Sequence, residues 1–432
     1  MTRSTNSSIG VCKNHYVHYV GDFDKISHIS IMINNQSRTG QAFWLGIGNL
    51  VSFSFGIVSA AILSRILSVE EYGTYRQVLY VYNTLLVVFT LGLPRAYSFF
   101  LARMPIEQGR KSVDKINAIF LLLGSLFSIL LFFGANYIGS VLKNPSLPSC
   151  LKYFSLSPIF LLPVLGIESV LATYKKSLYS TIYIILSRLF NLVCVILPVI
   201  ILNRSANMAV IGFTISSAIC CVIGLIIERR PFKDIKSEKS KISIKEILKY
   251  SYPLLLASVW AIIINSAPQF FISRWYGTEV FAEFANGFIE LPIAGMVISA
   301  VATVLLPEIS RLAKDETNIN EVISVWKSSF EKSAQIIYPL AVFACVFAPP
   351  IIEILYGDKY TAAIPYFRII IIINLVRVVP YAPIMMGMNM TKQYFIANFI
   401  PAILLIGLDY IWVDHSNSPY GIAFLQCFAI VL

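Results

Sequence analysis

Charged residues are scarce in this chain: 13% of its 432 residues are Asp, Glu, Lys or Arg, whereas 57% are hydrophobic. Soluble domains carry about 25% charged residues, so a water-soluble fold cannot bury this much apolar surface. A lipid bilayer can accept it, because the hydrocarbon interior acts as the solvent. The composition, with a mean hydropathy of +0.72, therefore predicts a polytopic membrane protein made of α-helices.

Sequence motifs of enzymes and channels are also missing. The chain has no G-x-x-x-x-G-K-[ST] motif for ATP, no nucleophile elbow and no TVGYG-like filter. Its four histidines and seven cysteines show no metal-ligand spacing and no C-x-x-C pair. We therefore expect a protein that is not an enzyme and that uses neither a metal ion nor a cofactor.

The net charge of +11 does not indicate nucleic acid, because the basic residues lie in short segments between apolar spans. With the N-terminus placed in the cytoplasm, the inner segments hold 23 of the 34 Lys and Arg residues, and the outer loops hold 7. Positive residues favour the cytoplasmic side, so this ratio predicts an N-in orientation in a bacterial inner membrane.

Twelve apolar stretches approach the roughly 20 residues that a spanning helix needs. They cover approximately 42–63, 78–102, 116–138, 152–173, 181–202, 208–227, 251–272, 284–306, 333–355, 365–387, 394–414 and 418–432. The polar segment 1–41 lacks a signal-peptide core and is expected to be a disordered cytoplasmic tail, with Met32 as an alternative start. The last span ends at Leu432 without a polar flank, which suggests truncation.

The basic linker 228–250 divides the spans into an N-lobe, 42–227, and a C-lobe, 251–432. Capping-box spacing at Ser243 predicts an amphipathic helix on the inner membrane surface before the seventh span, and residues 319–330 repeat this pattern. The segment SRILSVEEYGTY from residue 64 is similar to SRWYGTEVFAEF from residue 273. Six spans in each half then predict parallel repeats around a central cavity.

Arginine occurs inside several spans, where a charge costs at least ~2.5–3.5 kcal/mol on insertion scales. Arg368 begins its span and is expected to extend its side chain to the membrane edge. Arg95, Arg188 and Arg377 lie deeper, and we predict that they line a cavity and bind an anion. A guanidinium group suits phosphate because its planar fork makes two parallel hydrogen bonds.

Acidic residues also occur inside the spans, and they leave a second interpretation open. Their positions are Glu168, Glu290, Glu353 and Asp409. Such groups either pair with the arginines or couple transport to protons or sodium ions. Proline and glycine interrupt many spans, which is common in transporters whose lobes rock.

The stretch AFWLGIGNLVSFSFGIVSAAILSRILSVEEYGTYRQ, from residue 42, resembles the first span of Wzx-type polysaccharide flippases. LGLPRAYSFF, LLPEISRLAKD and ILYGDKYTAA, from residues 91, 305 and 354, are similar to later segments of that family. The family belongs to the multidrug, oligosaccharidyl-lipid and polysaccharide exporter superfamily. The resemblance implies two six-helix lobes and alternating access for an undecaprenyl-pyrophosphate-linked oligosaccharide, with Arg95, Arg188 and Arg377 facing its anionic groups.

Other functions remain open from the sequence. A drug/cation antiporter of the same superfamily should present acidic and aromatic residues in its cavity rather than several arginines. A polymerase usually needs a large outer loop, and the longest outer loop here has about a dozen residues. A structural role ranks lowest. The expected partners are the lipid-linked oligosaccharide, membrane lipids, and the polymerase and glycosyltransferases of one O-antigen, lipopolysaccharide or capsule pathway, without nucleic acid.

Overall fold

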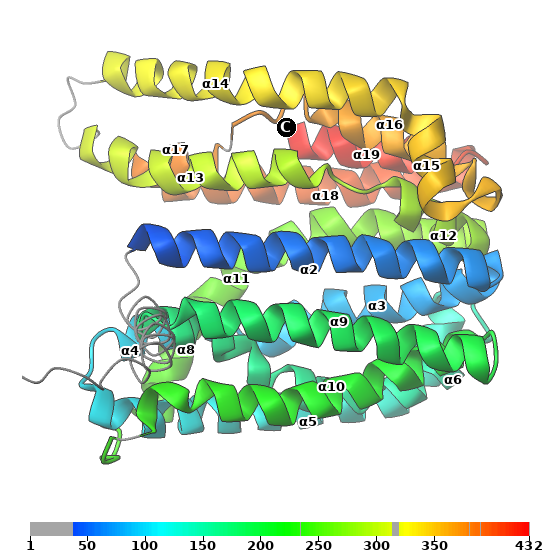
Figure 1. Cartoon of the computed structure of the whole chain (residues 1–432). Coiled ribbons are helices and arrows are strands. Elements are labelled where there is room, and N and C mark those ends of the chain that lie inside the picture. The colour runs from blue at the N-terminus through cyan, green and yellow to red at the C-terminus, as the bar shows by residue number, and fades with distance from the viewer. Residues whose placement is uncertain (1–37, 234, 313–318, 380, 389, 432) are drawn as a thin grey trace, which may run out of the picture.

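Helices that run side by side form the part of the chain that the computed structural model describes, residues 38–233, 235–312, 319–379, 381–388 and 390–431 (Figure 1). No strand occurs in these ranges. The N-lobe consists of α2 (Arg38–Ile66), α3 (Val69–Thr90), α4 (Leu93–Leu101), α5 (Ile106–Val141), α6 (Leu147–Phe154), α7 (Ser157–Leu161), η1 (Pro163–Gly166), α8 (Ile167–Thr173), α9 (Ser177–Ile201) and α10 (Ala206–Glu228).

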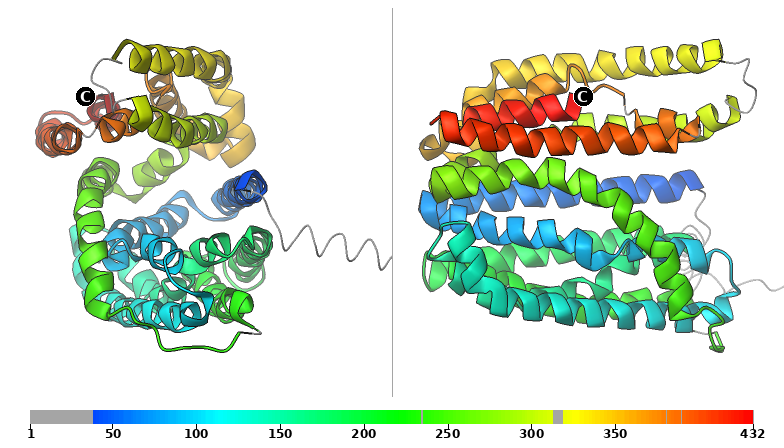
Figure 2. Two further views of the ribbon diagram at one scale, coloured as in Figure 1. Left: turned by 90° about the vertical axis from the view of Figure 1, so that its left-hand side faces the viewer. Right: turned by 180° about the vertical axis from the view of Figure 1, so that it is seen from behind.

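The C-lobe follows after η2 (Arg230–Phe232) and the rest of the linker. It consists of α11 (Ile244–Phe271), η3 (Ile272–Tyr276), α12 (Gly277–Gly287), α13 (Pro292–Leu312), α14 (Ile319–Val346), α15 (Ala348–Tyr356), η5 (Asp358–Tyr360), α16 (Ala363–Ile373), α17 (Ala382–Gly387), α18 (Thr391–His415) and α19 (Tyr420–Val431). In Figure 1, α13 to α19 of the C-lobe lie above the N-lobe, and Figure 2 shows α11 running along the N-lobe, where it contacts α3 and α4.

The helices of the two lobes follow one another in the same order. With the offset of 209 residues, α2 corresponds to α11, α5 to α14, α9 to α18 and α10 to α19. The pair α3 and α4 corresponds to α12 and α13, and the broken segment α6–α8 corresponds to α16 and α17. The internal similarity that begins at Ser64 and Ser273 therefore reflects a structural repeat.

Six helices of the described residues are long and apolar enough to cross a membrane, and two bent helix pairs raise the number to eight. Ala363–Ile373 and Tyr420–Val431 are shorter apolar helices. The chain is thus an α-helical, multi-pass membrane protein, while the count of twelve spans stays a prediction. The expected tail 1–41 lies almost wholly outside the described residues, apart from the first residues of α2.

Serine caps determine where two of the helices begin. The Ser68 side chain accepts a hydrogen bond from the Glu71 backbone N–H, and this N-cap starts α3 nine residues before the span expected from hydropathy. Ser243 and Glu246 form the capping box that the sequence predicted. The box starts α11 itself, which continues unbroken to Phe271.

The two expected surface helices are not separate elements, and their position relative to the membrane surface stays a prediction. Residues 244–250 are the first turns of α11, and residues 319–330 are the first turns of α14. Val322 of α14 belongs to one buried cluster with Leu305 and Ile309 of α13, and Trp326 packs against this cluster. Ile319 and Ile323 of the same apolar face stay exposed. Helical spacing of apolar residues cannot by itself distinguish a membrane surface from a neighbouring helix.

Several spans that the sequence predicted as single helices are broken. Pro158 and Pro163 separate the short helices between Leu147 and Thr173. The chain bends by 60° between α12 and α13 and by 72° between α14 and α15. Residues 374–379, which follow α16, are not helical. Backbone groups freed by such breaks need protein or water as partners, so the breaks indicate hydrated or closely packed regions.

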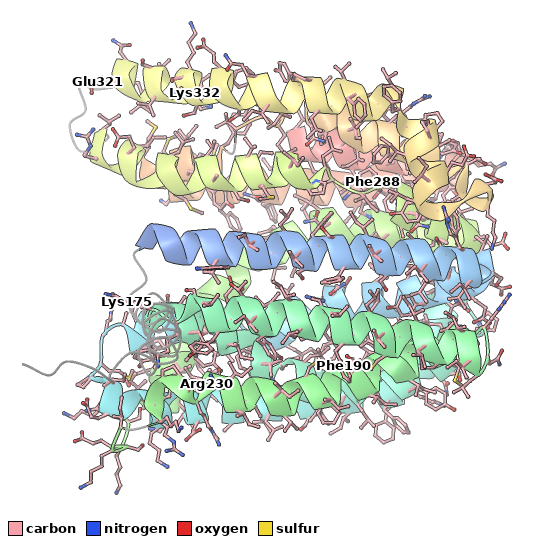
Figure 3. The ribbon with its side chains drawn as sticks, in the orientation of Figure 1. Lys175, Phe190, Arg230, Phe288, Glu321 and Lys332 are labelled. Atoms are coloured by element: carbon pink, nitrogen blue, oxygen red, sulfur yellow. The ribbon has the colours of Figure 1, made fainter. Side chains whose placement is uncertain are left out.

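The linker between the lobes lies along the first turns of α5. The Glu238 backbone N–H donates to the Glu107 carbonyl oxygen at 2.8 Å, and Lys115 Nζ donates to the carbonyl oxygens of Ser240 and Ile242 at 3.1 and 2.8 Å. We call this side of the molecule the linker end and the opposite side the far end. Lys175 and Arg230 lie at the linker end, on the left of Figure 3.

Close helix contact in the N-lobe depends on glycine. A Cβ atom at Gly212 in α10 would lie 1.9 Å from the Cys194 carbonyl oxygen of α9. We expect Gly212→Ala to separate these helices and to reduce the amount of monodisperse protein extracted from membranes several-fold. Gly407→Ala in α18 is the matched control, because no heavy atom lies within 4 Å of its Cβ position. Equal yields of the two variants would contradict the prediction.

Candidate functional site

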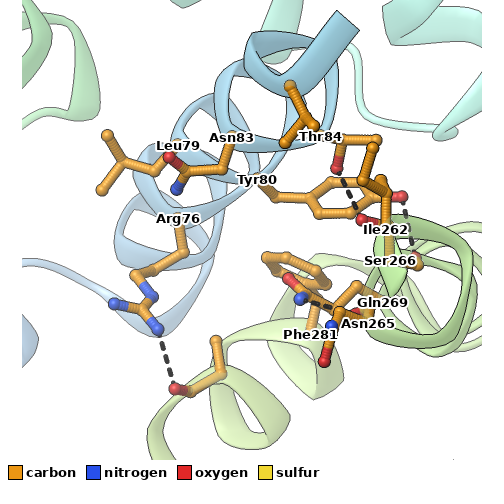
Figure 4. A pocket seen from close by; sticks show the side chains of 12 residues that line it. Arg76, Leu79, Tyr80, Asn83, Thr84, Ile262, Asn265, Ser266, Gln269 and Phe281 are labelled. Carbon is orange, nitrogen blue, oxygen red and sulfur yellow. Dashed lines mark hydrogen bonds between the residues drawn. The ribbon is translucent and has the colours of Figure 1, made fainter. Parts of the chain in front are cut away.

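A cavity of about 570 Å³ lies between the lobes, where α3 faces α11 and α12 (Figure 4). Amide and hydroxyl groups line much of it, contributed by Asn83, Thr84, Asn265, Ser266 and Gln269. The Thr84 and Ser266 hydroxyls are 3.1 Å apart, and the Tyr80 hydroxyl donates to the Ser266 carbonyl oxygen, so these contacts join the lobes. Such groups can hydrogen-bond a ligand that carries hydroxyls or charged oxygens.

Arg76 is the charged side chain among the residues that line this cavity. It lies two turns into α3, and its guanidinium donates to the Ala285 carbonyl oxygen of α12 at 2.8 Å. Arg76 also borders a second cavity, of about 170 Å³, within the N-lobe. A guanidinium has five N–H donors, so Arg76 can hold the two lobes together and still bind an anion.

The N-lobe contains a third cavity, of about 500 Å³, between α3, α8, α9 and α10. Arg188 of α9 lines both N-lobe cavities, and its binding of an anion stays a prediction. Glu168 of α8 lines the larger one, and no ion pair joins it to Arg188. Asn83 borders this cavity and the one between the lobes, so α3 is a wall of all three.

Arg377 lies in a different setting from the one predicted. The sequence placed it in the middle of a spanning helix, but the helix α16 ends at Ile373 and Arg377 follows in the break. Its side chain forms an ion pair with Glu290 at 3.3 Å, and Glu290 lies in the break between α12 and α13. The two side chains are 45% and 57% exposed. Here the structure supports the alternative of internal pairing, because the pair bridges two broken spans.

Glu353 and Arg368 lie apart from the three cavities. Arg95 is in α4, but its side chain is outside the described part of the structure. Glu353 is exposed near the end of α15, and its backbone carbonyl accepts a hydrogen bond from Arg65. Arg368 is exposed and donates to the Cys345 carbonyl oxygen, and its expected extension to the membrane edge stays a prediction.

Asp409 differs from the other acidic candidates, because its residue is 0% exposed. Neither carboxyl oxygen has a hydrogen-bond partner among the described residues. The expected salt pairing is therefore not formed at this position. A buried carboxyl group without a partner is costly, and such groups are common where a protein binds and releases a proton.

The chain matches the family described as "Polysaccharide biosynthesis protein" over residues 62–365. It belongs to this family. The chain is 22% identical over 402 residues to an "Uncharacterized membrane protein in cps region" of Klebsiella pneumoniae, covering 90% of this chain and 79% of that protein. It is also 22% identical to the "Succinoglycan biosynthesis transport protein ExoT" of Rhizobium meliloti, covering 77% of this chain and 65% of that protein.

Solved structures show that this polysaccharide biosynthesis protein has the fold of MATE transporters. An inward-facing multidrug resistance MATE transporter of the MOP superfamily matches with a TM-score of 0.71 at 12% identity, covering 90% of this chain and 94% of that chain. An outward-facing multidrug resistance MATE transporter matches with a TM-score of 0.59 at 14% identity, covering 93% of this chain and 95% of that chain. A MOP superfamily transporter from Pyrococcus furiosus matches with a TM-score of 0.61 at 14% identity, covering 93% of this chain and 94% of that chain.

Arg76 was not among the predicted site residues, because it lies before residue 78, where the expected span began. Hydropathy placed the start of the span at residue 78, because Glu70, Glu71 and Arg76 lower the average. The cap residue Ser68, followed by two acidic residues in the first turn, was the available signal for an earlier helix start. The cavity amides Asn83, Asn265 and Gln269 gave no signal, because single amides in a span have no characteristic spacing.

Proposed function

We propose that this polysaccharide biosynthesis protein moves an anionic, lipid-linked oligosaccharide across a bacterial inner membrane by alternating access. The observation that carries the proposal is the cavity between the lobes, which has hydrogen-bonding amides and hydroxyls along its wall and one guanidinium group, that of Arg76. The family and the two relatives named above support a polysaccharide pathway. Glycosyltransferases would supply the cargo, and a polymerase would use it.

The chemistry of the lining fits such a cargo. Arg76 can make two parallel hydrogen bonds to a phosphate, and Arg188 adds a second positive charge in the adjoining N-lobe cavities. Uncharged amides can pair with sugar hydroxyls as donors and acceptors. A charged group in a site of low dielectric constant attracts an anion more strongly than it does in water.

The orientation and the coupling ion belong to the same proposal. The excess of Lys and Arg in the predicted inner segments supports a cytoplasmic linker end. Cargo would then enter from the linker end while the lobes are in contact at the far end. Asp409 and Glu168 are the acidic residues proposed to couple transport to protons or sodium ions, Asp409 because it is buried without a partner.

Drug/cation antiport is the second candidate, and two observations favour it: the MATE fold and the carboxylate of Glu168 in the N-lobe cavity. The two functions place opposite charges on the cargo. An antiporter for cationic drugs should lose activity when Glu168 is neutralised and should tolerate the loss of Arg188. The flippase should show the reverse order of sensitivity.

Replacing the cavity arginines tests the proposal. In a strain that lacks the chromosomal gene, we expect Arg188→Ala and Arg76→Ala each to lower surface polysaccharide at least about tenfold, a loss equivalent to 1.4 kcal/mol of binding. Lipid-linked oligosaccharide should accumulate in the membrane. Arg188→Lys should restore part of the export, because it keeps the charge but not the fork.

Arg204→Ala is the matched control, because Arg204 is exposed in the α9–α10 connection and lines none of these cavities. Arg188→Ala tests anion binding more specifically than Arg76→Ala does, because Arg76→Ala also removes a hydrogen bond between the lobes. Normal surface polysaccharide with Arg188→Ala and Arg76→Ala, at normal protein levels, would contradict an anionic cargo in these cavities.

A further inference from the structure

Two arginines at the far end reach across to the opposite lobe in the same manner. Arg65, at the end of α2 in the N-lobe, donates to the carbonyl oxygens of Glu353 and Ile354 in α15 of the C-lobe. Arg274, in η3 after α11 of the C-lobe, donates to the carbonyl oxygen of Val141, the last residue of α5 in the N-lobe. Each guanidinium therefore contacts the last residues of a helix in the other lobe.

These two arginines are equivalent in the internal repeat. Ser64-Arg65 and Ser273-Arg274 are separated by the repeat offset of 209 residues, and α2 corresponds to α11. Their cross-lobe contacts are therefore reciprocal. Lys359, after α15, adds a third contact, because its Nζ donates to the carbonyl oxygens of Arg65 and Leu67 at 3.3 and 3.2 Å, at the end of α2.

The physical basis of these contacts is the carbonyl end of an α-helix; the Glu353 carbonyl also accepts from the Gly357 backbone N–H at 2.8 Å. The last four carbonyl groups of a helix have no partner within it, and they carry a partial negative charge. A cation that donates to these carbonyl groups supplies a hydrogen bond and also offsets their partial negative charge. When the cation belongs to the other lobe, this stabilisation exists only while the lobes are in contact at the far end.

A buried polar layer lies beneath these contacts and also joins the lobes. The Tyr72 hydroxyl of α3 donates to Asn286 Oδ1 of α12 at 2.6 Å, and Gln77 Nε2 of α3 donates to Ser273 Oγ at 2.7 Å. Asn286 and Gln77 are again separated by 209 residues. Arg76, which lines the cavity between the lobes, is the neighbour of Gln77 in α3 and donates to Ala285, the neighbour of Asn286, so the cavity begins next to this layer.

We propose that Arg65, Arg274 and Lys359 form a carbonyl clamp that holds the far end closed, and that the clamp releases when the lobes part to discharge cargo. The proposal rests on alternating access as proposed above. The cations are at or near the surface, so water can replace each carbonyl when the contact breaks. This property suits a gate that must open repeatedly, because exposed charged contacts are weak one by one and act together here.

Thiol labelling tests the clamp independently of any cargo. Ile262 lines the cavity between the lobes, so Ile262→Cys in an otherwise cysteine-free chain reports access to it. A membrane-impermeant maleimide is applied to vesicles of each orientation, so that one reaction enters from the far end and the other from the linker end. Without clamp substitutions, we expect slow labelling from the far end.

Removing the clamp should reverse this preference. We expect Arg65→Gln with Arg274→Gln and Lys359→Gln to accelerate labelling from the far end about tenfold and to slow labelling from the linker end, because the closed state loses its differential stabilisation. Arg65→Gln alone and Arg274→Gln alone should each give a smaller acceleration, and the two should be similar because the residues are equivalent in the repeat.

Arg204→Gln is the matched control, because Arg204 is an exposed far-end arginine that makes no cross-lobe hydrogen bond within the described part of the chain; it should leave both labelling rates unchanged. Far-end labelling of the triple variant within twofold of the parent rate would overturn the clamp. An acceleration with only one of the single arginine variants would overturn its reciprocity. The parent chain could label as expected and yet restore no surface polysaccharide to a strain that lacks the gene. That result would retain the clamp and contradict the proposed cargo instead.

Discussion

Replacing Gly73 by alanine is expected to hold the far end open and to lower polysaccharide export at least about tenfold. Gly73 lies in α3 of the N-lobe, where a Cβ atom would be 2.3 Å from the Thr278 carbonyl oxygen of α12. Real Cβ atoms essentially never approach a backbone atom this closely, so α3 and α12 must separate. Tyr72 and Gln77, on the same helix, would then lose their cross-lobe partners.

Helix propensity favours alanine over glycine, so a loss of export could not be attributed to a weaker α3. Alanine is favoured over glycine in a helix by about 1 kcal/mol, so Gly73→Ala should not weaken α3 itself. Surface polysaccharide, protein level and labelling of Ile262→Cys from the far end should be measured together. The expected result is low export and fast labelling at a normal protein level.

Gly46→Ala in α2 provides the comparison, because no heavy atom lies within 4 Å of its Cβ position. It should change neither export nor labelling. Normal export with Gly73→Ala would mean that the close approach of α3 and α12 is not required during transport.

The helical architecture could be predicted from the sequence because it depends on hydropathy averaged over about 20 residues. Apolar runs gave α2, α5, α9, α10 and α18 with errors mainly at their ends. The breaks were harder to place. Residues 288–291 and 374–379 interrupt apolar runs, and an average over a window of ~20 residues conceals such short interruptions.

The candidate site was only partly predictable, for a related reason. Arg188 stood out because it is a charge inside an apolar run, and the structure places it in two cavities. Arg377 stood out in the same way, yet it pairs with Glu290 from a span 87 residues away in sequence. No local pattern distinguishes these outcomes, because each depends on which helix packs opposite. The same holds for Arg65 and Arg274, whose repeat was visible in the sequence but whose cross-lobe contacts were not.

Asp409 supplies the second large prediction, in which stability and transport change in opposite directions. The carboxyl group is fully buried in α18 without a partner, and a buried polar group in this state costs roughly 1–3 kcal/mol. We expect Asp409→Leu, which replaces it with an apolar side chain of similar length, to raise the midpoint of thermal unfolding in detergent. The same variant should abolish surface polysaccharide, because it removes a group that can carry a proton.

Asp409→Asn separates the two effects. The amide cannot bind and release a proton, so export should be lost, but it remains polar and buried, so the gain in stability should be absent. Asp409→Glu should retain part of the export. Asp414→Asn serves as the control, since Asp414 is an exposed acidic residue on the same helix and should leave both quantities unchanged.

The combination of results decides what the buried carboxyl group does. Higher stability with lost export would show that the chain retains a destabilising residue for its function, as active sites often do. Higher stability with normal export would remove Asp409 from the coupling step and leave Glu168, which lines the larger N-lobe cavity, as the other candidate. Lower stability with Asp409→Leu would mean that the carboxyl group binds a partner in the folded protein, such as an ordered water molecule or a cation.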